Sequence, residues 1–202
     1  MKNNKKTIGV DVDGVMLDIS DPWMRYLKRR YPFKGVNQWN SDVENGCIDY
    51  NLGNYFNIPP TENSLKFFKY EKLYDKLSCY ESARIVLQKL YEEGWNIIFI
   101  SYCADCGSHA KSKAQMLQRE CNFIAPEDFH FVQTKSKGVF AGVLTAFIDD
   151  RNSFINQLLD SEHEVLCIKK DTPYKQDEEL LHSVPVVQDW YDVYEILGEN
   201  NG

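Results

Sequence analysis

The sequence has no apolar run long enough to cross a membrane. A spanning helix needs about 20 consecutive apolar residues, and no stretch of the 202 residues approaches that length. The basic segment Met1 to Lys6 is followed by a short strand-like run, which is not the apolar stretch of a signal peptide. We therefore expect a cytoplasmic protein with no membrane partner.

Basic residues are in the minority. The sequence has 23 Lys and Arg against 30 Asp and Glu, a formal net charge of -7 at pH 7, and no basic stripe. A general nucleic-acid binder would carry such a stripe to neutralise backbone phosphates. We therefore expect no nucleic-acid partner, and any recognition of phosphate must be local.

Cysteine and histidine are also scarce. Six cysteines are too few for a disulfide framework in a chain of this size. Cys103 and Cys106 suggest a metal or redox site, but a structural zinc site needs four ligands, and no second Cys or His pair stands at a suitable spacing. We interpret the cysteines as reduced thiols. The four histidines are scattered, and we expect even His109 to lie at the surface.

Two carboxylates separated by a single residue are the starting point for interpreting the rest of the sequence. Asp11 and Asp13, in the segment Asp11 to Val15, follow the apolar run Ile8 to Val10. If that run is a buried strand followed by a glycine-bearing turn, both carboxylates lie at its carboxyl end, where open α/β sheets bind ligands. The segment therefore predicts a cation site.

Other chemistry-bearing residues also follow apolar runs. Ser101 follows the run 96–100, Lys135 and Lys137 follow a short strand at 129–132, and Asp149 and Asp150 follow the run 144–148. Strands packed as one parallel sheet would bring these groups to a common edge.

Such a cluster suits phosphoryl transfer. Several carboxylates can hold Mg²⁺, which prefers oxygen ligands. A lysine and a hydroxyl can bind the remaining phosphoryl oxygens. One carboxylate can serve as nucleophile and a second as general acid and base.

In this order and context, these residues resemble the four motifs of the haloacid dehalogenase-like (HAD) phosphatase superfamily. Further stretches are similar to its 5′(3′)-deoxyribonucleotidase branch. They are Thr134 to Lys137, Ile148 to Arg151, the pair Phe67 and Phe68, and the closing segment Trp190 to Leu197. The resemblance implies a HAD-like parallel sheet flanked by helices, of Rossmann type, and a nucleotidase that acts on nucleoside monophosphates.

The resemblance also implies roles for the acids. Asp11 would be the nucleophile and a ligand of Mg²⁺. Asp13 would be the general acid and base, and its main-chain carbonyl would reach the metal. Asp149 would bind the metal directly, and Asp150 would bind it or lie just behind its ligands.

For the phosphoryl oxygens, the resemblance implies Ser101 and Lys137 as ligands, with Lys135 as the alternative to Lys137. Asp13 carries a further implication, because dehalogenases and cation pumps of the superfamily have another residue at that position. The resemblance thus favours a phosphatase.

The alternation of strands and helices predicts an α/β fold with a parallel sheet. Besides the strands named above, we expect one at 165–168. Helices are expected at 18–31, 82–94, 108–121, 152–159 and 191–197, with helix-like spacing over 62–80. Ser82 is the expected cap of the second helix and Gly94 its end.

By the resemblance, residues 1–15 and 81–202 would form the catalytic core, and residues 16–80 a small, largely helical cap. The cap is rich in aromatic residues, which can stack on a nucleobase. The candidates for substrate binding are Trp39, Phe56, Phe67 and Phe68. Alternatively, most of these rings form the core of the cap itself.

Other functions remain open at this stage. Within enzymes, the alternatives are a phosphatase of another small phosphomonoester, such as a sugar phosphate, and a phosphotransferase. Outside enzymes, one alternative is the receiver domain of a phosphorylation switch, in which the paired acids come early and the phosphorylated aspartate follows in mid-chain. The acids of this sequence stand in a different order. A second alternative is a catalytically silent binding protein, which would not need both Asp11 and Asp13. Both a monomer and a homodimer stay open, because the sequence does not determine the oligomeric state.

Overall fold

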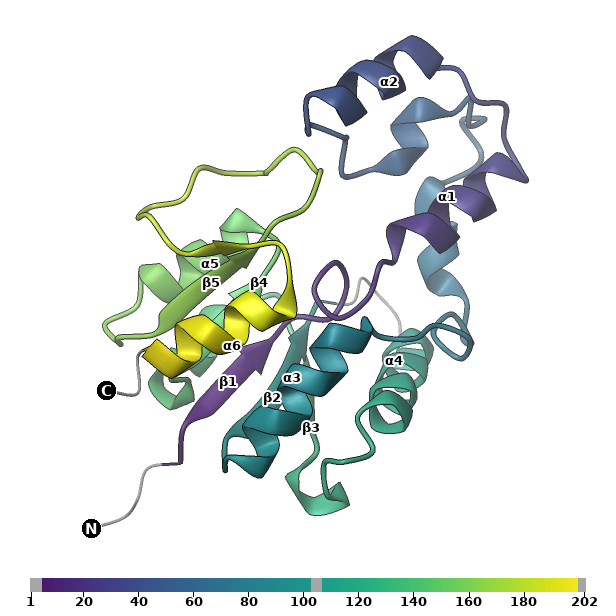
Figure 1. Cartoon of the computed structure of the whole chain (residues 1–202). Coiled ribbons are helices and arrows are strands. Elements are labelled where there is room, and N and C mark those ends of the chain that lie inside the picture. Colours follow the sequence, from purple (N-terminus) through teal and green to yellow (C-terminus); the bar gives the residue numbers. More distant parts are fainter. Residues whose placement is uncertain (1–4, 103–106, 200–202) are drawn as a thin grey trace.

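One parallel sheet forms the centre of the structure, a computed structural model that describes residues 5–102 and 107–199 (Figure 1). Its six strands lie in the order β3-β2-β1-β4-β5-β6. They are β1 Thr7–Val10, β2 Asn96–Ser101, β3 His130–Gln133, β4 Ala146–Asp149, β5 Leu166–Lys170 and β6 Val186–Val187. The predicted parallel α/β sheet is confirmed. Strand β6 is not predicted from the sequence, because two residues are too few to form a recognisable run. Cys103 and Cys106 lie outside the described residues.

The register of the central strands places their carboxyl ends side by side. Val10 of β1 pairs with Phe99 of β2 on one side and with Ile148 of β4 on the other. After β1 the chain passes to β2 and β3 on one side of the sheet, and later to β4, β5 and β6 on the other. Ligands bind in α/β sheets at such a reversal. The sheet therefore has its natural binding crevice beyond the ends of β1 and β4.

Helices cover both faces of the sheet (Figure 1). Helices α3 (Glu81–Glu92), α4 (Gly107–Glu120) and α6 (Trp190–Glu199) pack on one face in the largest apolar cluster. Helix α5 (Asn152–Leu159) and the 3-10 segment η4 (Lys137–Val143) pack on the other. A short 3-10 turn, η3 (Pro126–Asp128), precedes β3.

The ends of α3 confirm one prediction and correct another. Gly94 follows the helix with a φ of 90° and donates its N–H to the Tyr91 carbonyl, as a terminating glycine does. Ser82 is not the cap, because the helix begins one residue earlier and Tyr80 occupies the cap position. The Ser82 hydroxyl instead donates to Asp189, near α6.

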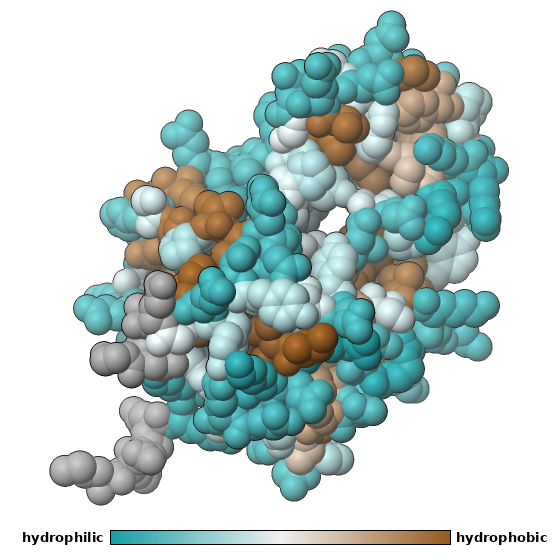
Figure 2. All heavy atoms as spheres, viewed as in Figure 1, coloured by the Kyte–Doolittle hydropathy of each residue, from teal (hydrophilic) through white to brown (hydrophobic). Residues whose placement is uncertain are grey.

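The chain between β1 and α3 forms a smaller layer with an apolar cluster of its own. Its elements are α1 (Ser20–Lys28), α2 (Val36–Glu44) and two 3-10 segments, η1 (Leu52–Tyr55) and η2 (Ser64–Lys69). This layer, called the cap below, projects above the carboxyl edge of the sheet (Figure 1). Trp23, Leu27 and Phe56 are among its buried residues. Figure 2 shows the surface hollowed between the cap and the sheet with the helices packed on its two faces, which together are called the sheet domain.

The helix-like spacing at 62–80 does not produce an α-helix. Two carbonyls that a helix would use internally bind side chains from elsewhere. The Trp23 indole N–H donates to the Ser64 carbonyl at 3.1 Å, and His109 Nδ1 binds the Phe68 carbonyl at 2.8 Å. After η2 the chain continues in turns that are bonded to α4. The division into core and cap at residue 80 stays a prediction.

A loop of the sheet domain also contacts the cap. The Ile48 N–H donates to the Pro173 carbonyl at 2.9 Å, and the Lys175 N–H donates to the Ile48 carbonyl at 2.8 Å. The Tyr50 and Tyr174 rings meet beside this bridge, with centroids 5.6 Å apart. The cap is therefore fastened to the sheet domain on the side away from α4. Within the described ranges, no helix is both long enough and apolar enough to cross a bilayer.

Trp190 allows a test of this packing. It is buried, and its indole N–H donates to the Val15 carbonyl in the loop after β1 at 3.0 Å. We expect Trp190→Ala to lower the free energy of unfolding by about 3–5 kcal/mol, the usual cost of such a truncation. Urea unfolding measures it. The neighbouring Tyr191 is about half-exposed, so Tyr191→Ala should change the value by only about 0.5 kcal/mol. Equal effects of the two variants would contradict this packing.

Candidate active site

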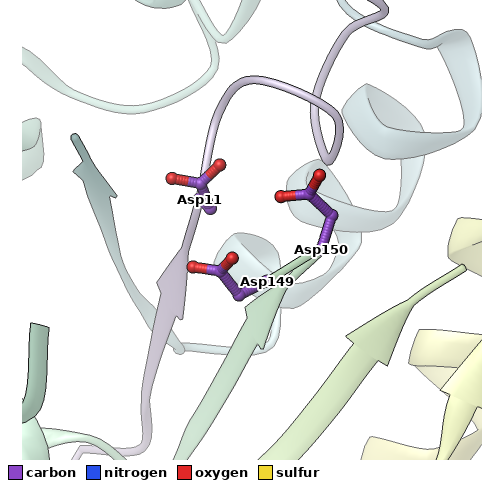
Figure 3. Close-up of side chains that lie close together, drawn as sticks. All are labelled: Asp11, Asp149 and Asp150. Atoms are coloured by element: carbon purple, nitrogen blue, oxygen red, sulfur yellow. The ribbon is translucent and has the colours of Figure 1, made fainter. Parts of the chain in front are cut away.

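Three carboxylates meet at the carboxyl edge of the sheet (Figure 3). Asp11 directly follows β1, Asp149 is the last residue of β4, and Asp150 comes next. Each offers an oxygen within 4.8 Å of the others, and all three residues are buried. The β1–β4 pairing causes this meeting, since the Asp11 N–H also donates to the Ile148 carbonyl at 3.0 Å. The predicted juxtaposition of the two acid motifs is thus present.

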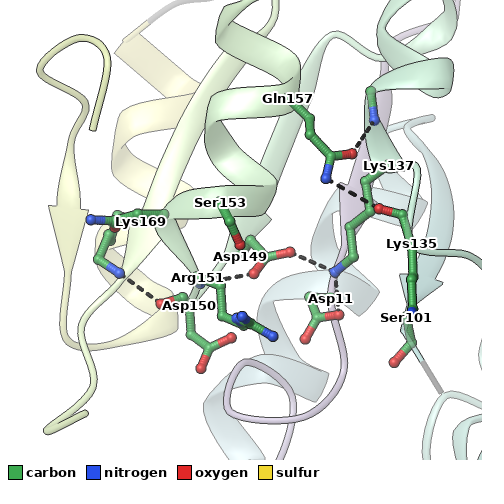
Figure 4. A network of polar contacts seen from close by, with 12 residues as sticks. Asp11, Ser101, Lys135, Lys137, Asp149, Asp150, Arg151, Ser153, Gln157 and Lys169 are labelled. Carbon is green, nitrogen blue, oxygen red and sulfur yellow. Dashed lines mark hydrogen bonds and ion pairs between the residues drawn. The ribbon is translucent and has the colours of Figure 1, made fainter. Parts of the chain in front are cut away.

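Lys137 lies between two of these carboxylates (Figure 4). Its Nζ is 2.5 Å from an Asp11 oxygen and 2.6 Å from an Asp149 oxygen, and the side chain is fully buried. Burial lowers the pKa of Lys137, but its attraction to Asp11 and Asp149 outweighs burial and leaves this pKa raised. Lys135 instead places its ammonium over the Tyr102 ring, 4.9 Å from the centroid. The geometry favours Lys137 over Lys135 as the lysine at the carboxylates.

The lysines at the cluster do not offset the burial of its carboxylates, although Lys169 donates to the Asp150 carbonyl at 2.6 Å in addition to the contacts of Lys137. Burial raises the pKa of Asp11 to about 7, against the lowering effect of Lys137, and Asp149 raises it further. Burial, followed by the charges of Asp149 and Asp11, holds the pKa of Asp150 well above its ordinary value. Clustered carboxylate oxygens whose charge is not balanced by a neighbouring cation are ligands of the kind that Mg²⁺ binds. Asp11, Asp149 and Asp150 therefore fit a magnesium ion.

Gly14 is needed where the loop after β1 passes Asp150. It has a φ of 84°, which L side chains rarely adopt, and a Cβ at this position would lie 2.7 Å from an Asp150 carboxylate oxygen. Any side chain here would therefore strain the backbone and displace an acid of the cluster.

Asp13 has different neighbours from Asp11. Its side chain accepts from the Tyr74 hydroxyl at 2.9 and 3.0 Å and from Lys113 Nζ at 2.7 Å. Lys113 also donates to the Ser101 hydroxyl oxygen at 2.9 Å. Asp13 and Ser101 are thus joined by a lysine, and the Asp13 side chain is not part of the carboxylate triad. Metal contact by the Asp13 carbonyl stays a prediction.

Lys113 and Tyr74 are not among the site residues predicted from the sequence. A signal for Lys113 does exist, because it precedes Met116 and Leu117 by three and four residues on α4. That spacing puts the lysine on the apolar face of the helix, and all three residues are fully buried. A lysine on such a face needs a buried partner. Tyr74 carries no comparable signal, because its segment forms no regular helix.

His109 corrects another expectation. It is 1% exposed and not at the surface. Its Nδ1 binds the Phe68 carbonyl, and its Nε2 is buried with no hydrogen-bond partner among the described residues. Burial, helped by the charge of Lys113, lowers the pKa of His109. The ring is therefore neutral, and Nδ1 carries the proton.

A cavity of about 300 Å³ connects these groups with the cap. Its sheet-domain wall includes Asp11, Asp13, Ser101 and Asp150. Aromatic side chains also line it: Trp23, Tyr50, Phe68, Tyr102, Phe154 and Tyr174. The Arg151 guanidinium lies at the same wall, paired with Asp177 and 4.8 Å from the centroid of the Tyr50 ring. The cavity therefore combines a charged floor with aromatic walls.

Of the four cap aromatics named from the sequence, Phe68 lines this cavity. The other three pack within the cap. Trp39 meets the edge of the Tyr55 ring with centroids 5.0 Å apart, Phe56 is 1% exposed, and Phe67 stacks on Trp23. Their placement favours the interpretation that these three rings form the core of the cap and do not bind substrate.

Comparison with known proteins bears on the fold. No family model and no curated protein matches the sequence. Among solved structures, a predicted phosphoglycolate phosphatase from Haemophilus somnus 129PT has a TM-score of 0.60 at 14% identity, over 98% of this chain and 100% of that one. D,D-heptose 1,7-bisphosphate phosphatase from B. bronchiseptica, complexed with magnesium and phosphate, has a TM-score of 0.57 at 11% identity, over 96% and 99%.

A haloacid dehalogenase-like family hydrolase from Xanthomonas campestris has a TM-score of 0.54 at 10% identity, over 96% of this chain and 95% of that one. At such identities the likeness establishes the fold, and the predicted HAD-like fold is confirmed. The similarity to the deoxyribonucleotidase branch stays a prediction.

The unbalanced carboxylates predict how Mg²⁺ affects stability. In the metal-free folded protein the pKa of Asp11 is about 7, above its ordinary value of 3.8. The folded state thus keeps a proton that the unfolded state releases, and stability falls as pH rises through that interval. Mg²⁺ competes with this proton. We expect millimolar Mg²⁺ to raise the Tm more at about pH 7.5 than at about pH 5, as measured by thermal unfolding.

Two variants test the origin of that shift. Asp150→Asn should lose most of the Mg²⁺-dependent rise in Tm, because it removes a carboxylate of the triad. Asp160→Asn changes an exposed aspartate beyond α5 and should keep the rise. A rise of the same size in both variants would show that Mg²⁺ stabilises the protein elsewhere.

Proposed function

We propose that this protein is a Mg²⁺-dependent phosphomonoester hydrolase that transfers the phosphoryl group first to Asp11 and then to water. The observation that carries the proposal is the arrangement at the cavity floor. A buried nucleophile candidate stands beside Lys137 and two further acids, and Asp13 lies at the same cavity in a separate hydrogen-bonded setting.

In the first step an Asp11 oxygen attacks phosphorus, and the bond to the ester oxygen breaks. Asp13, which must enter this step protonated, gives that proton to the leaving oxygen, which departs as an alcohol. Lys137, 2.5 Å from Asp11, favours the ionised nucleophile and offsets the charge of the phosphoryl oxygens. Ser101 lines the cavity and donates its hydroxyl hydrogen to one of those oxygens.

In the second step water attacks the aspartyl phosphate and gives a proton to Asp13. Inorganic phosphate leaves, and both aspartates return to their starting states. Mg²⁺ held by Asp11, Asp149 and Asp150 would supply positive charge that stabilises the phosphoryl oxygens in both steps.

Two other functions of the same fold are less well supported. A dehalogenase needs the nucleophile but has no ester oxygen to protonate, so it gives no role to Asp13 and its hydrogen-bond donors. A silent binding protein needs a cavity, but it does not need a buried acid cluster, which is costly to maintain. The presence of both aspartates at one cavity therefore supports hydrolysis.

For the substrate we propose a nucleoside monophosphate. The aromatic walls of the cavity offer flat apolar surfaces on which a base can stack. The alternative is a sugar phosphate or another small phosphomonoester. It is supported by the similar structures of a heptose bisphosphate phosphatase and a predicted phosphoglycolate phosphatase.

A substrate panel tests the reaction. We expect phosphate release from ribo- and deoxyribonucleoside monophosphates to exceed release from sugar phosphates, and EDTA to abolish it. Asp11→Asn should lower kcat on the order of 10⁴-fold, as expected for loss of a nucleophile. Hydrolysis of sugar phosphates alone would replace the nucleotidase proposal with the alternative. An Asp11→Asn variant that keeps more than a few per cent of activity would refute the assigned nucleophile.

Phe68 tests the substrate class. Phe68→Ala removes an aromatic wall of the cavity, and base stacking contributes about 1–3 kcal/mol. We expect KM for a nucleoside monophosphate to rise about tenfold and KM for a base-free ester such as ribose 5-phosphate to change little. Tyr70→Ala is the matched control, because Tyr70 is an exposed cap residue outside the cavity lining. Equal rises for both substrates would argue against stacking on Phe68.

A further inference from the structure

Asp13 is held by two donors from outside its own loop. The Tyr74 hydroxyl lies 2.9 Å from one carboxylate oxygen and 3.0 Å from the other. Lys113 Nζ lies 2.7 Å from the second oxygen. Tyr74 precedes α3 and Lys113 belongs to α4, so two separate elements converge on this carboxylate. Such convergence fixes the direction in which the acid points.

Lys113 also determines how Ser101 can bond. The Ser101 hydroxyl oxygen accepts from Lys113 at 2.9 Å. A hydroxyl has a single hydrogen, and one that accepts from an ammonium must donate that hydrogen in another direction. Ser101 is 1% exposed and lines the cavity. Lys113 therefore leaves the Ser101 hydrogen for a ligand oxygen.

Tyr74 is itself firmly held. Its backbone N–H donates to the Ser112 hydroxyl oxygen at 3.0 Å, and that hydroxyl donates to Asp75 at 2.9 Å. Arg119 donates to the Asp75 carbonyl at 3.0 Å. These bonds fasten the segment to α4, the helix that carries Lys113. Helix α4 thus carries one donor to Asp13 and holds the segment that carries the other.

We infer that Lys113 and Tyr74 are positioning residues, which aim Asp13 at the leaving-group oxygen and, through Lys113, orient Ser101 toward the phosphoryl group. This inference rests on the proposed phosphatase activity. Neither residue exchanges a proton with the substrate. Their contribution is to keep the acid and the hydroxyl in the geometry that the first chemical step requires.

The inference predicts a dependence on the leaving group. An ester whose leaving group is already acidic departs without much help from a proton donor, whereas a poor leaving group depends on one. p-Nitrophenyl phosphate and phenyl phosphate have nearly the same shape and differ in this respect. A misplaced Asp13 should therefore slow the hydrolysis of phenyl phosphate more than that of p-nitrophenyl phosphate.

The variants are Tyr74→Phe, which removes only the hydroxyl, and Lys113→Met, which removes the ammonium. We expect each to lower kcat for phenyl phosphate about tenfold more than for p-nitrophenyl phosphate. Lys113→Met should also raise KM for both esters, because Ser101 loses its orienting partner, while Tyr74→Phe should leave KM unchanged. In an Asp13→Asn background Tyr74→Phe should not lower kcat further, because its hydroxyl acts only through Asp13.

Matched controls come from neighbouring residues. Lys111→Met changes an exposed lysine on the same helix, and Tyr70→Phe changes an exposed tyrosine of the preceding segment. Neither should alter the ratio of the two kcat values. Thermal unfolding checks that each variant is folded, and Tyr74→Phe decides the question if Lys113→Met does not fold.

Two kinds of negative result are distinguishable. Wild-type protein that hydrolyses neither aryl ester nor any member of the substrate panel would overturn the proposed phosphatase and this inference with it. Wild-type activity combined with equal losses on both aryl esters in Tyr74→Phe and Lys113→Met would overturn this inference alone, because it would assign the two residues a purely structural role.

Discussion

The mutual repulsion of three buried carboxylates is the constraint on which the site depends. Asp11, Asp149 and Asp150 are taken out of water and brought within 4.8 Å of one another, and Lys137 supplies one positive charge. Burial of unbalanced charge costs free energy, which the packing of the whole sheet domain must offset. The β1–β4 pairing enforces the cluster, because Val10 pairs with Ile148 and the acids that follow these two residues therefore lie side by side.

The loop after β1 transmits this constraint to the rest of the molecule. Gly14 lets the chain pass Asp150 closely enough to keep the acids together, and Trp190 anchors the same loop through the Val15 carbonyl. The far end of the sequence therefore holds the first motif in place. Asp13, in the same loop, accepts from Tyr74, which lies in the chain between η2 and α3.

The features that could be predicted from the sequence are the apolar strands and the polar residues at their ends. Apolar runs located β1, β2 and β4, and the acids and the serine that follow these runs could be placed at one edge because parallel strands share a direction. The 3-10 geometry of η2 was not predictable, because the carbonyls of Ser64 and Phe68 are bound by Trp23 and His109 from distant positions. Lys113 was overlooked because a lone lysine is usually solvated, although its place on the apolar face of α4 was visible.

Two carboxylates separated by a single residue thus acquire opposite surroundings. Asp11 faces two other acids and shares Lys137 with one of them, so a cation or a proton must complete its environment. Asp13 faces the ammonium of Lys113 and the hydroxyl of Tyr74, which offer it hydrogen bonds and no repulsion. When the environments of neighbouring acids differ in this way, their chemical roles separate. The difference between the two acids is therefore built by the strands and helices around the motif, and the motif alone does not contain it.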